Sequence, residues 1–173
     1  MIDVTRQEIL HILKRCEVFL GLSDADLEKI AALPSAHTEI FEKGAHIANE
    51  GEKSQNLYIL ADGKVDLRML IELDLGIPPK EITVDTVTKG SVFAWSALVR
   101  PYILNRTFLC AETSTVLMIN GKELIALMDS NEHIGYEIMQ NIAFVIASRL
   151  RIPNNYFWAE SLRKKAFGSL SQS

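Results

Sequence analysis

The sequence predicts a mainly β protein, an antiparallel sandwich or barrel with helices before and after it along the chain. Three observations predict this class. Between about residues 37 and 120, short β-branched and apolar runs alternate with Gly, Asp, Asn and Pro, as in antiparallel sheets. Before residue 35, apolar residues instead recur at helical spacing. The longest helical stripe follows residue 130.

Two short helices are expected at the start of the chain. Thr5 and Glu8 have the spacing of a capping box, and the apolar stripe that follows should end near Cys16. Ser23 and Asp26 repeat the start signal. The second helix should end at the proline of AALP, because the residue before a proline disfavours the α conformation.

The strand pattern is clearest in NLYILADGKVDLRMLI. Asp62 and Gly63 suit a two-residue β-hairpin turn, and alternating residues flank them on both sides, so a hairpin is predicted here. The Gly- and Pro-containing segment LDLGIPPK should form an exposed loop. EITVDTVT, TFLCAE and TVLMIN are predicted strands, and KELIALMD is a predicted short helix.

A long helix is predicted from about Glu132 to Arg151. Ser130 or Asn131 can cap it, and Pro153 should end it. Its broad apolar stripe contains Ile134, Ile138, Ile142, Val145, Ile146 and Leu150. Such a stripe can pack on the chain's own barrel, on a second copy of the chain, or on both.

Composition limits the class of protein. The chain has 173 residues, enough for one domain with a real core, and a net charge of -4 gives no general attraction to DNA. Cys16 and Cys110 are too few for a disulfide framework and suit a reducing compartment. Neither a signal peptide nor a membrane span is evident, so the protein is predicted to be cytoplasmic.

The order of elements and several local motifs together resemble the cyclic-nucleotide-binding domain family, as in the effector domains of catabolite-activator-protein-like regulators. The matching stretches run from about residue 16 to 151 and include KGAHIANEG, LYILADGKV and VFAWSALVRPYILNRTF. The resemblance implies a double-stranded β-helix (jelly-roll) barrel with flanking helices. It divides the chain into a helical cap at 1–35, a barrel at 36–130, a long helix at 131–152 and a tail at 153–173, without a helix-turn-helix.

The resemblance also implies a ligand segment that departs from the family pattern. The family usually reads Phe-Gly-Glu-x-Ala-Leu, followed later by an Arg and a small residue. Its backbone N–H groups and Arg bind a cyclic phosphate, while its carboxylate accepts a hydrogen bond from the ribose. The corresponding residues here are Phe93, Ala94, Trp95, Ser96, Ala97, Arg106 and Thr107.

Two substitutions alter that segment. Trp95 stands at the carboxylate position, where its indole can donate a hydrogen bond but cannot accept one from a ribose hydroxyl. It either lines a ligand cavity or plugs the barrel. Ala94 replaces the usual Gly, which would strain the turn by about 1 kcal/mol if a positive φ is required. Arg106 retains the cation for an anion.

Other chemistries lack the residues they need. His46 and Glu50 resemble part of a cupin metal motif, but a single His cannot supply a three-ligand site. The acidic residues are scattered, so no paired general acid and base is expected. Arg163, Lys164 and Lys165 could dock the tail on a protein partner or an anionic surface, although three charges bind weakly.

The predicted function is a non-enzymatic regulatory or sensor module. It would bind a small anionic effector, either a cyclic nucleotide or another phosphate-bearing molecule, and signal through its C-terminal helix. The predicted partners are this effector and a second copy of the chain, with a protein partner as a further option and no direct DNA contact. The alternative is a ligand-free dimerisation or interaction scaffold whose pocket is closed.

Overall fold

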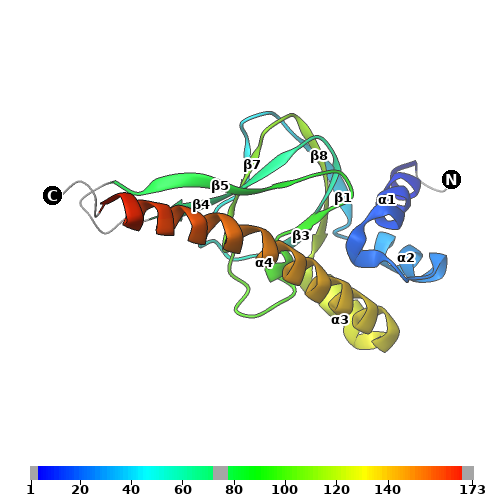
Figure 1. Cartoon of the computed structure of the whole chain (residues 1–173). Coiled ribbons are helices and arrows are strands. Elements are labelled where there is room, and N and C mark those ends of the chain that lie inside the picture. The colour runs from blue at the N-terminus through cyan, green and yellow to red at the C-terminus, as the bar shows by residue number, and fades with distance from the viewer. Residues whose placement is uncertain (1–3, 72–77, 169–173) are drawn as a thin grey trace.

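Two four-stranded antiparallel sheets face each other in the computed structural model, which describes residues 4–71 and 78–168 (Figure 1). One sheet has the order β1-β8-β3-β6 and the other β2-β7-β4-β5. The strands are β1 (His37–Phe41), β2 (His46–Ala48), β3 (Asn56–Asp62), β4 (Val65–Ile71), β5 (Lys80–Val87), β6 (Val92–Phe93), β7 (Thr107–Cys110) and β8 (Ser114–Asn120). All but one pair of consecutive strands change sheet, which confirms the predicted jelly-roll barrel.

The predicted hairpin at Asp62-Gly63 is wrong, although both of its strands are present. β3 and β4 belong to different sheets and do not pair, whereas β4 pairs with β5 from Val65↔Val87 to Ile71↔Lys80. Gly63 has a φ of 92°, so the segment carries the chain across the barrel instead of folding it back. Turn residues and alternation identify strands and bends but do not state which strand is the partner. Most of the predicted exposed loop, residues 72–77, lies outside the described residues.

The N-terminal helices form as predicted, with one change at the start. α1 (Val4–Arg15) already includes Thr5 in its first turn, so Thr5 is not the predicted cap. A 3-10 turn, η1 (Glu17–Phe19), connects to α2 (Asp24–Ala31). The Ser23 side chain accepts a hydrogen bond from the Asp26 N–H, and the Asp26 carboxylate accepts one from the Ser23 N–H, which completes the predicted capping box.

The C-terminal helix is longer than predicted. α3 (Gly121–Ser130) precedes α4 (Glu132–Gly168), and Asn131 Oδ1 accepts the Ile134 N–H at 3.3 Å at the start of α4. The predicted end at Pro153 is wrong, because α4 continues through it. Proline disfavours a helix interior by about 3 kcal/mol, a cost that the surrounding helix can outweigh. In Figure 1, α4 extends from α3 along the barrel towards the far end of β4 and β5.

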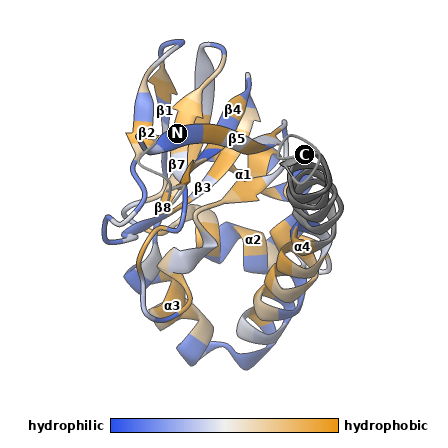
Figure 2. Cartoon of the chain, turned by 60° about the vertical axis from the view of Figure 1, so that its left-hand side comes forward, coloured by the Kyte–Doolittle hydropathy of each residue, from blue (hydrophilic) through white to orange (hydrophobic). Residues whose placement is uncertain are grey.

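Two hydrophobic clusters form the interior. The first joins α1, α2, α3 and α4 to the outer side of the β3–β8 sheet, and it buries Ile134, Ile138, Ile142 and Val145 from the predicted stripe. The second fills the barrel between the two sheets. Figure 2 shows hydrophobic residues along the strands and recurring along α4. Leu150, also in the predicted stripe, is 64% exposed. None of the helices in the described ranges has the length and apolar character needed to cross a membrane.

Candidate functional site

The predicted ligand segment leaves the edge strand β6 through a left-handed turn. Ala94 has φ 57° and ψ 37°, and the 3-10 turn η2 (Trp95–Ala97) follows it directly. Within this turn, the Ala97 N–H donates a hydrogen bond to the Ala94 carbonyl at 3.0 Å. The strain predicted for Ala94 depended on a positive φ at this position, and the structure has one. An alanine here costs on the order of 1 kcal/mol relative to a right-handed conformation.

Phe93 and Ala94 are buried inside the barrel. The Phe93 ring stacks on Tyr58 at 5.2 Å and meets Phe108 edge-on at 5.1 Å, both measured between ring centroids. Ala94 is 4% exposed and belongs to the same cluster, to which Leu104 also contributes. Phe93 and Ala94 therefore anchor the turn in the barrel interior, which is lined by aromatic rings next to them.

Trp95 does not plug the barrel. Its half-buried side chain packs against the first hydrophobic cluster, on the side of the helices. The guanidinium carbon of Arg149, on α4, lies 5.0 Å from the centre of the Trp95 ring, which is a cation–π contact. The indole at the position of the family's carboxylate is thus engaged by the chain's own long helix.

Arg149 makes further contacts around this turn. Its Nη2 donates to the Val92 carbonyl at 2.6 Å, and its guanidinium lies 3.5 Å from a Glu17 oxygen and 3.7 Å from an Asp85 oxygen. Its side chain is only 16% exposed. Burial lowers the pKa of Arg149, and the nearby charges of Glu17 and Asp85 oppose that shift. An arginine remains charged even so, and this ion cluster joins α4, η1, β5 and β6.

Arg106 and Thr107 occupy the start of β7, in the opposite sheet. Thr107 is buried, and its hydroxyl oxygen accepts the Glu50 N–H at 3.0 Å. Arg106 is half-buried and donates to the carbonyl of its neighbour Asn105. Among the described residues it forms no ion pair.

The structure brings the two halves of the predicted site to one barrel interior. Leu104 and Phe108 on the Arg106 side share the barrel cluster with Phe93 and Ala94. In the described parts of the chain, no hydrogen bond or ion pair connects Arg106 with residues 93–97. Ser96 and Ala97 lie in the same short turn as Trp95. Residues 93–97 thus contact one another within the turn, while Arg106 and Thr107 lie across the barrel from them.

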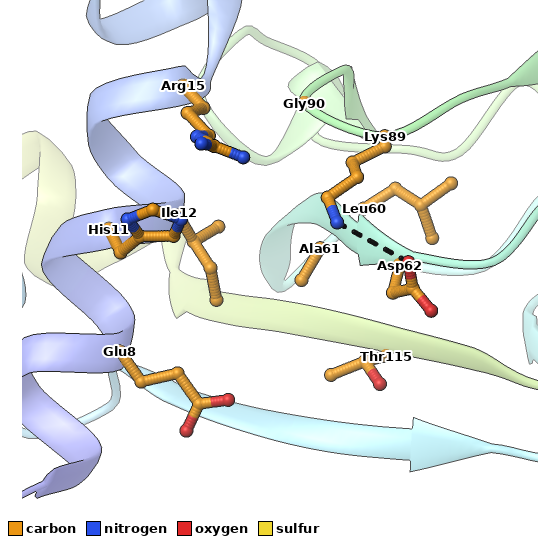
Figure 3. Close-up of a pocket in the computed structure, with 10 residues that line it drawn as sticks. All are labelled: Glu8, His11, Ile12, Arg15, Leu60, Ala61, Asp62, Lys89, Gly90 and Thr115. Carbon is orange, nitrogen blue, oxygen red and sulfur yellow. Dashed lines mark hydrogen bonds and ion pairs between the residues drawn. The ribbon is translucent and has the colours of Figure 1, made fainter.

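A cavity of about 240 Å³ lies away from the predicted ligand segment, between α1 and the end of β3 (Figure 3). Arg15 and Lys89 contribute positive charge, while Glu8 and Asp62 contribute negative charge. Lys89 Nζ already lies 3.5 Å from Asp62 Oδ1. None of the seven predicted site residues lines this cavity.

The described segments contain no group of three His, Cys, Asp or Glu side chains that could bind a metal ion together. His46 Nδ1 lies 2.9 Å from Asn49 Oδ1, and Glu50 Oε2 accepts the Leu70 N–H at 3.1 Å. The two residues that resembled part of a cupin motif therefore have separate partners.

Sequence reasoning missed three residues that shape the ligand segment. Arg149 and Glu17 hold Val92, the residue before Phe93. Gly121 brings the start of α3 so close to the Ala97 carbonyl that a side-chain methyl there would overlap it. One signal was available for Arg149, because a charged residue four positions after Val145 falls on the buried stripe of the helix.

Comparisons with known proteins agree with this architecture. The model of the cyclic nucleotide-binding domain family matches residues 38–131. cGMP-dependent protein kinase 2 of Mus musculus is 25% identical over 117 residues, which are 68% of this chain but only 15% of the kinase. The chain therefore spans a small part of that relative.

Solved structures share the fold. A cyclic nucleotide-binding domain from Methylobacillus flagellatus has a TM-score of 0.74 at 13% identity, covering 90% of this chain and 83% of that one. A candidate cyclic nucleotide-binding protein from Geobacter metallireducens has a TM-score of 0.67 at 28% identity, covering 81% and 96%. The regulatory domain of Toxoplasma gondii PKA with cAMP has a TM-score of 0.67 at 21% identity, covering 83% and 50%. Because the family model spans more than half of the sequence and the jelly-roll fold agrees with it, this chain belongs to the cyclic nucleotide-binding domain family.

Proposed function

We propose that this chain is a non-enzymatic regulatory module that binds a small anionic effector between residues 93–97 and Arg106 and signals through α4. The observation that carries the proposal is the left-handed conformation of Ala94, which preserves a tight turn at the family's glycine position despite the strain. The absence of an ion pair to Arg106 among the described residues supports a role as an anion ligand.

The effector class follows from the donors and acceptors at hand. A phosphate-bearing molecule suits an arginine and backbone amides. A ribose has no acceptor at Trp95, and the lost hydrogen bond costs about 1–3 kcal/mol, which is one to two decades of affinity. Relatives whose names specify cGMP or cAMP make these nucleotides the first ligands to test.

Thermal unfolding with 1 mM cyclic AMP or cyclic GMP tests this effector class. A ligand with a micromolar dissociation constant would stabilise the chain by about 4 kcal/mol under these conditions. We expect no more than about 1.4–2.7 kcal/mol, because the missing acceptor weakens binding by one to two decades. Phosphorylated metabolites that lack a ribose should stabilise more, and Arg106→Ala should abolish their effect. A large cyclic-nucleotide shift that Arg106→Ala abolishes would contradict the argument from Trp95.

We also propose that α4 pairs with its twin in a homodimer. Outside its buried stripe, α4 exposes Tyr136, Met139, Phe144 and Leu150, which are 60%, 40%, 74% and 64% exposed. Four large apolar side chains along one helix favour burial against an equivalent surface over contact with water. Phe144→Glu should therefore give a monomer in sedimentation equilibrium, while Gln7→Glu, an equally charged change at an exposed polar position of α1, should leave a dimer. A wild-type monomer at all concentrations would exclude the pairing.

The alternative, a ligand-free scaffold, also has a specific observation in its favour. The aromatic cluster of Tyr58, Phe93 and Phe108 fills the barrel beneath the segment, and Arg149 engages Trp95 above it. If no compound in a screen of nucleotides, phosphorylated metabolites and aromatic acids shifts the unfolding temperature, the scaffold function is supported and the effector proposal fails.

A further inference from the structure

Val92, the residue immediately before the ligand segment, is bound by the side chains of Glu17 on η1 and Arg149 on α4. Its N–H donates to Glu17 Oε1 at 3.1 Å, and its carbonyl accepts from Arg149 Nη2 at 2.6 Å. Among the described strands, β6 lies at the edge of its sheet and pairs with β3 alone. Glu17 and Arg149 therefore satisfy the outward backbone groups that a further strand would otherwise pair.

Glu17 and Arg149 also contact each other and the elements around them. Their oxygen and nitrogen lie 3.5 Å apart, and the Glu17 N–H donates to the Gly90 carbonyl at 3.2 Å. Arg149 reaches Asp85 on β5 and lies over the Trp95 ring. A single side chain of α4 thus contacts two acidic residues, a backbone carbonyl of β6 and the first residue of η2.

Burial makes these contacts strong. The Arg149 side chain is 16% exposed, and charge-assisted hydrogen bonds in such surroundings are stronger than neutral ones. Glu17 and Asp85 are more exposed, at 36% and 29%, so water weakens the ion pairs more than it weakens the hydrogen bond to the Val92 carbonyl. Arg149 accordingly connects α4 to Val92 by a hydrogen bond and to Trp95 by a cation–π contact.

We propose that Arg149 is a positioning residue that latches α4 to the ligand segment through Val92 and Trp95, and that this latch is closed without any bound effector. The contacts that make it are all within the chain, so the latch does not depend on the proposed effector binding. An effector that stacks on Trp95 or moves Val92 would have to displace Arg149, and this would free the middle of α4.

Hydrogen–deuterium exchange of the ligand-free chain tests the latch. In Arg149→Met, amides in residues 143–150 should exchange roughly tenfold to a hundredfold faster, with the exchange rates of β3 as the reference. This factor corresponds to the loss of one charge-assisted hydrogen bond. Arg68→Met is the matched control. Arg68 is also half-buried and pairs with Glu81 at 2.8 Å, but this contact joins β4 to β5 and does not involve α4. It should leave the ratio of α4 to β3 exchange unchanged.

Trp95 provides a second, spectroscopic measurement. The chain has only two tryptophans, so Trp158→Phe leaves Trp95 as the single reporter. Arg149→Met should shift its emission to longer wavelength as the ring gains contact with water, Arg149→Lys should recover part of the shift by restoring the charge, and Arg68→Met should have no effect. An unchanged exchange ratio and an unchanged emission in Arg149→Met would overturn the proposal.

Folding failure does not rescue the proposal from the test. If Arg149→Met does not fold, Arg149→Lys and Glu17→Gln take its place, since each keeps one polar contact with Val92 while weakening the ion pair. Faster α4 exchange in both, with β3 protected, supports the latch. Equal loss of protection in α4 and β3 would show that these residues only stabilise the whole domain, and the latch would be refuted. None of these outcomes requires an effector, so the effector proposal can fail while the latch stands.

Discussion

Gly63→Ala should destabilise the barrel by about 2–5 kcal/mol, more than the same substitution at Gly44. Both glycines have a left-handed φ, 92° at Gly63 and 87° at Gly44, which costs an alanine about 1–2 kcal/mol. A methyl at Gly63 would also lie 2.5 Å from Ser114 Oγ and 2.6 Å from the Thr113 carbonyl, whereas one at Gly44 would meet nothing within 4 Å. Overpacking of this kind typically adds 1–3 kcal/mol.

The surroundings of Gly63 have little freedom to adjust. Ser114 is buried, and its hydroxyl accepts the Lys64 N–H at 3.1 Å and donates to backbone carbonyls beside it. Moving Ser114 away from a methyl would weaken these bonds, which are worth about 0.5–1.5 kcal/mol each. The additional loss at Gly63 therefore reports the crossing of the chain between sheets.

Urea unfolding followed by far-UV circular dichroism measures both losses. For a two-state domain, the midpoints of Gly63→Ala and Gly44→Ala should differ at an unchanged m-value. Equal destabilisation by the two variants would refute the reasoning, because the conformational penalty alone would then explain both. A change in m-value for Gly63→Ala would instead indicate that the barrel no longer closes.

Two further predictions concern ionisable groups in the helical cap and the barrel. The hydrogen bond from the Ser23 side chain, followed by that from Lys29, lowers the pKa of Asp26. The ionised Asp26 carboxylate therefore stabilises the fold above its ordinary pKa, and this stabilisation is lost as the pH falls through the lower pKa of the folded state. Asp26→Asn should reduce the slope of the unfolding free energy between about pH 5 and pH 2, and parallel curves for the two proteins would contradict this. Burial raises the pKa of Cys16 to about 12 and also raises that of Cys110, so a thiol reagent at pH 8 should label neither in the native chain and both in urea, and rapid native labelling would be the contrary result.

The elements of the fold were predictable from the sequence because local signals determine them. Helical stripes, the Ser23 capping box and the alternating strands all depend on neighbours within a few residues. Strand partners depend on the whole chain, and this is why Asp62-Gly63 was wrongly predicted as a hairpin. The predicted helix end at Pro153 was wrong for a related reason. A local penalty of about 3 kcal/mol ends a helix only when no other interaction favours helical residues beyond the proline.

The candidate site was only partly predictable. The resemblance pointed to Ala94 as a strained position, and its φ of 57° agrees. The contacts of Trp95 could not be predicted, because its partner Arg149 is 54 residues away in sequence and belongs to another element. Glu17 was equally inaccessible, since its role depends on an edge strand 75 residues later. Periodicity places Arg149 on the buried stripe of its helix, but it does not identify the partners of such long-range polar contacts.

The lost ribose acceptor and the Arg149 latch would weaken effector binding by separable routes. If the latch contributes about 1.5–3 kcal/mol, it lowers the population of the undocked form of α4 about 13-fold to 160-fold relative to a chain without it. An effector that requires the undocked form would then bind more weakly by the same factor than it would without the latch. Arg149→Met removes this factor but supplies no acceptor at Trp95. A phosphorylated ligand should therefore gain affinity in Arg149→Met if its binding frees α4, and an effector with equal affinity for both forms would gain nothing and could not move the helix.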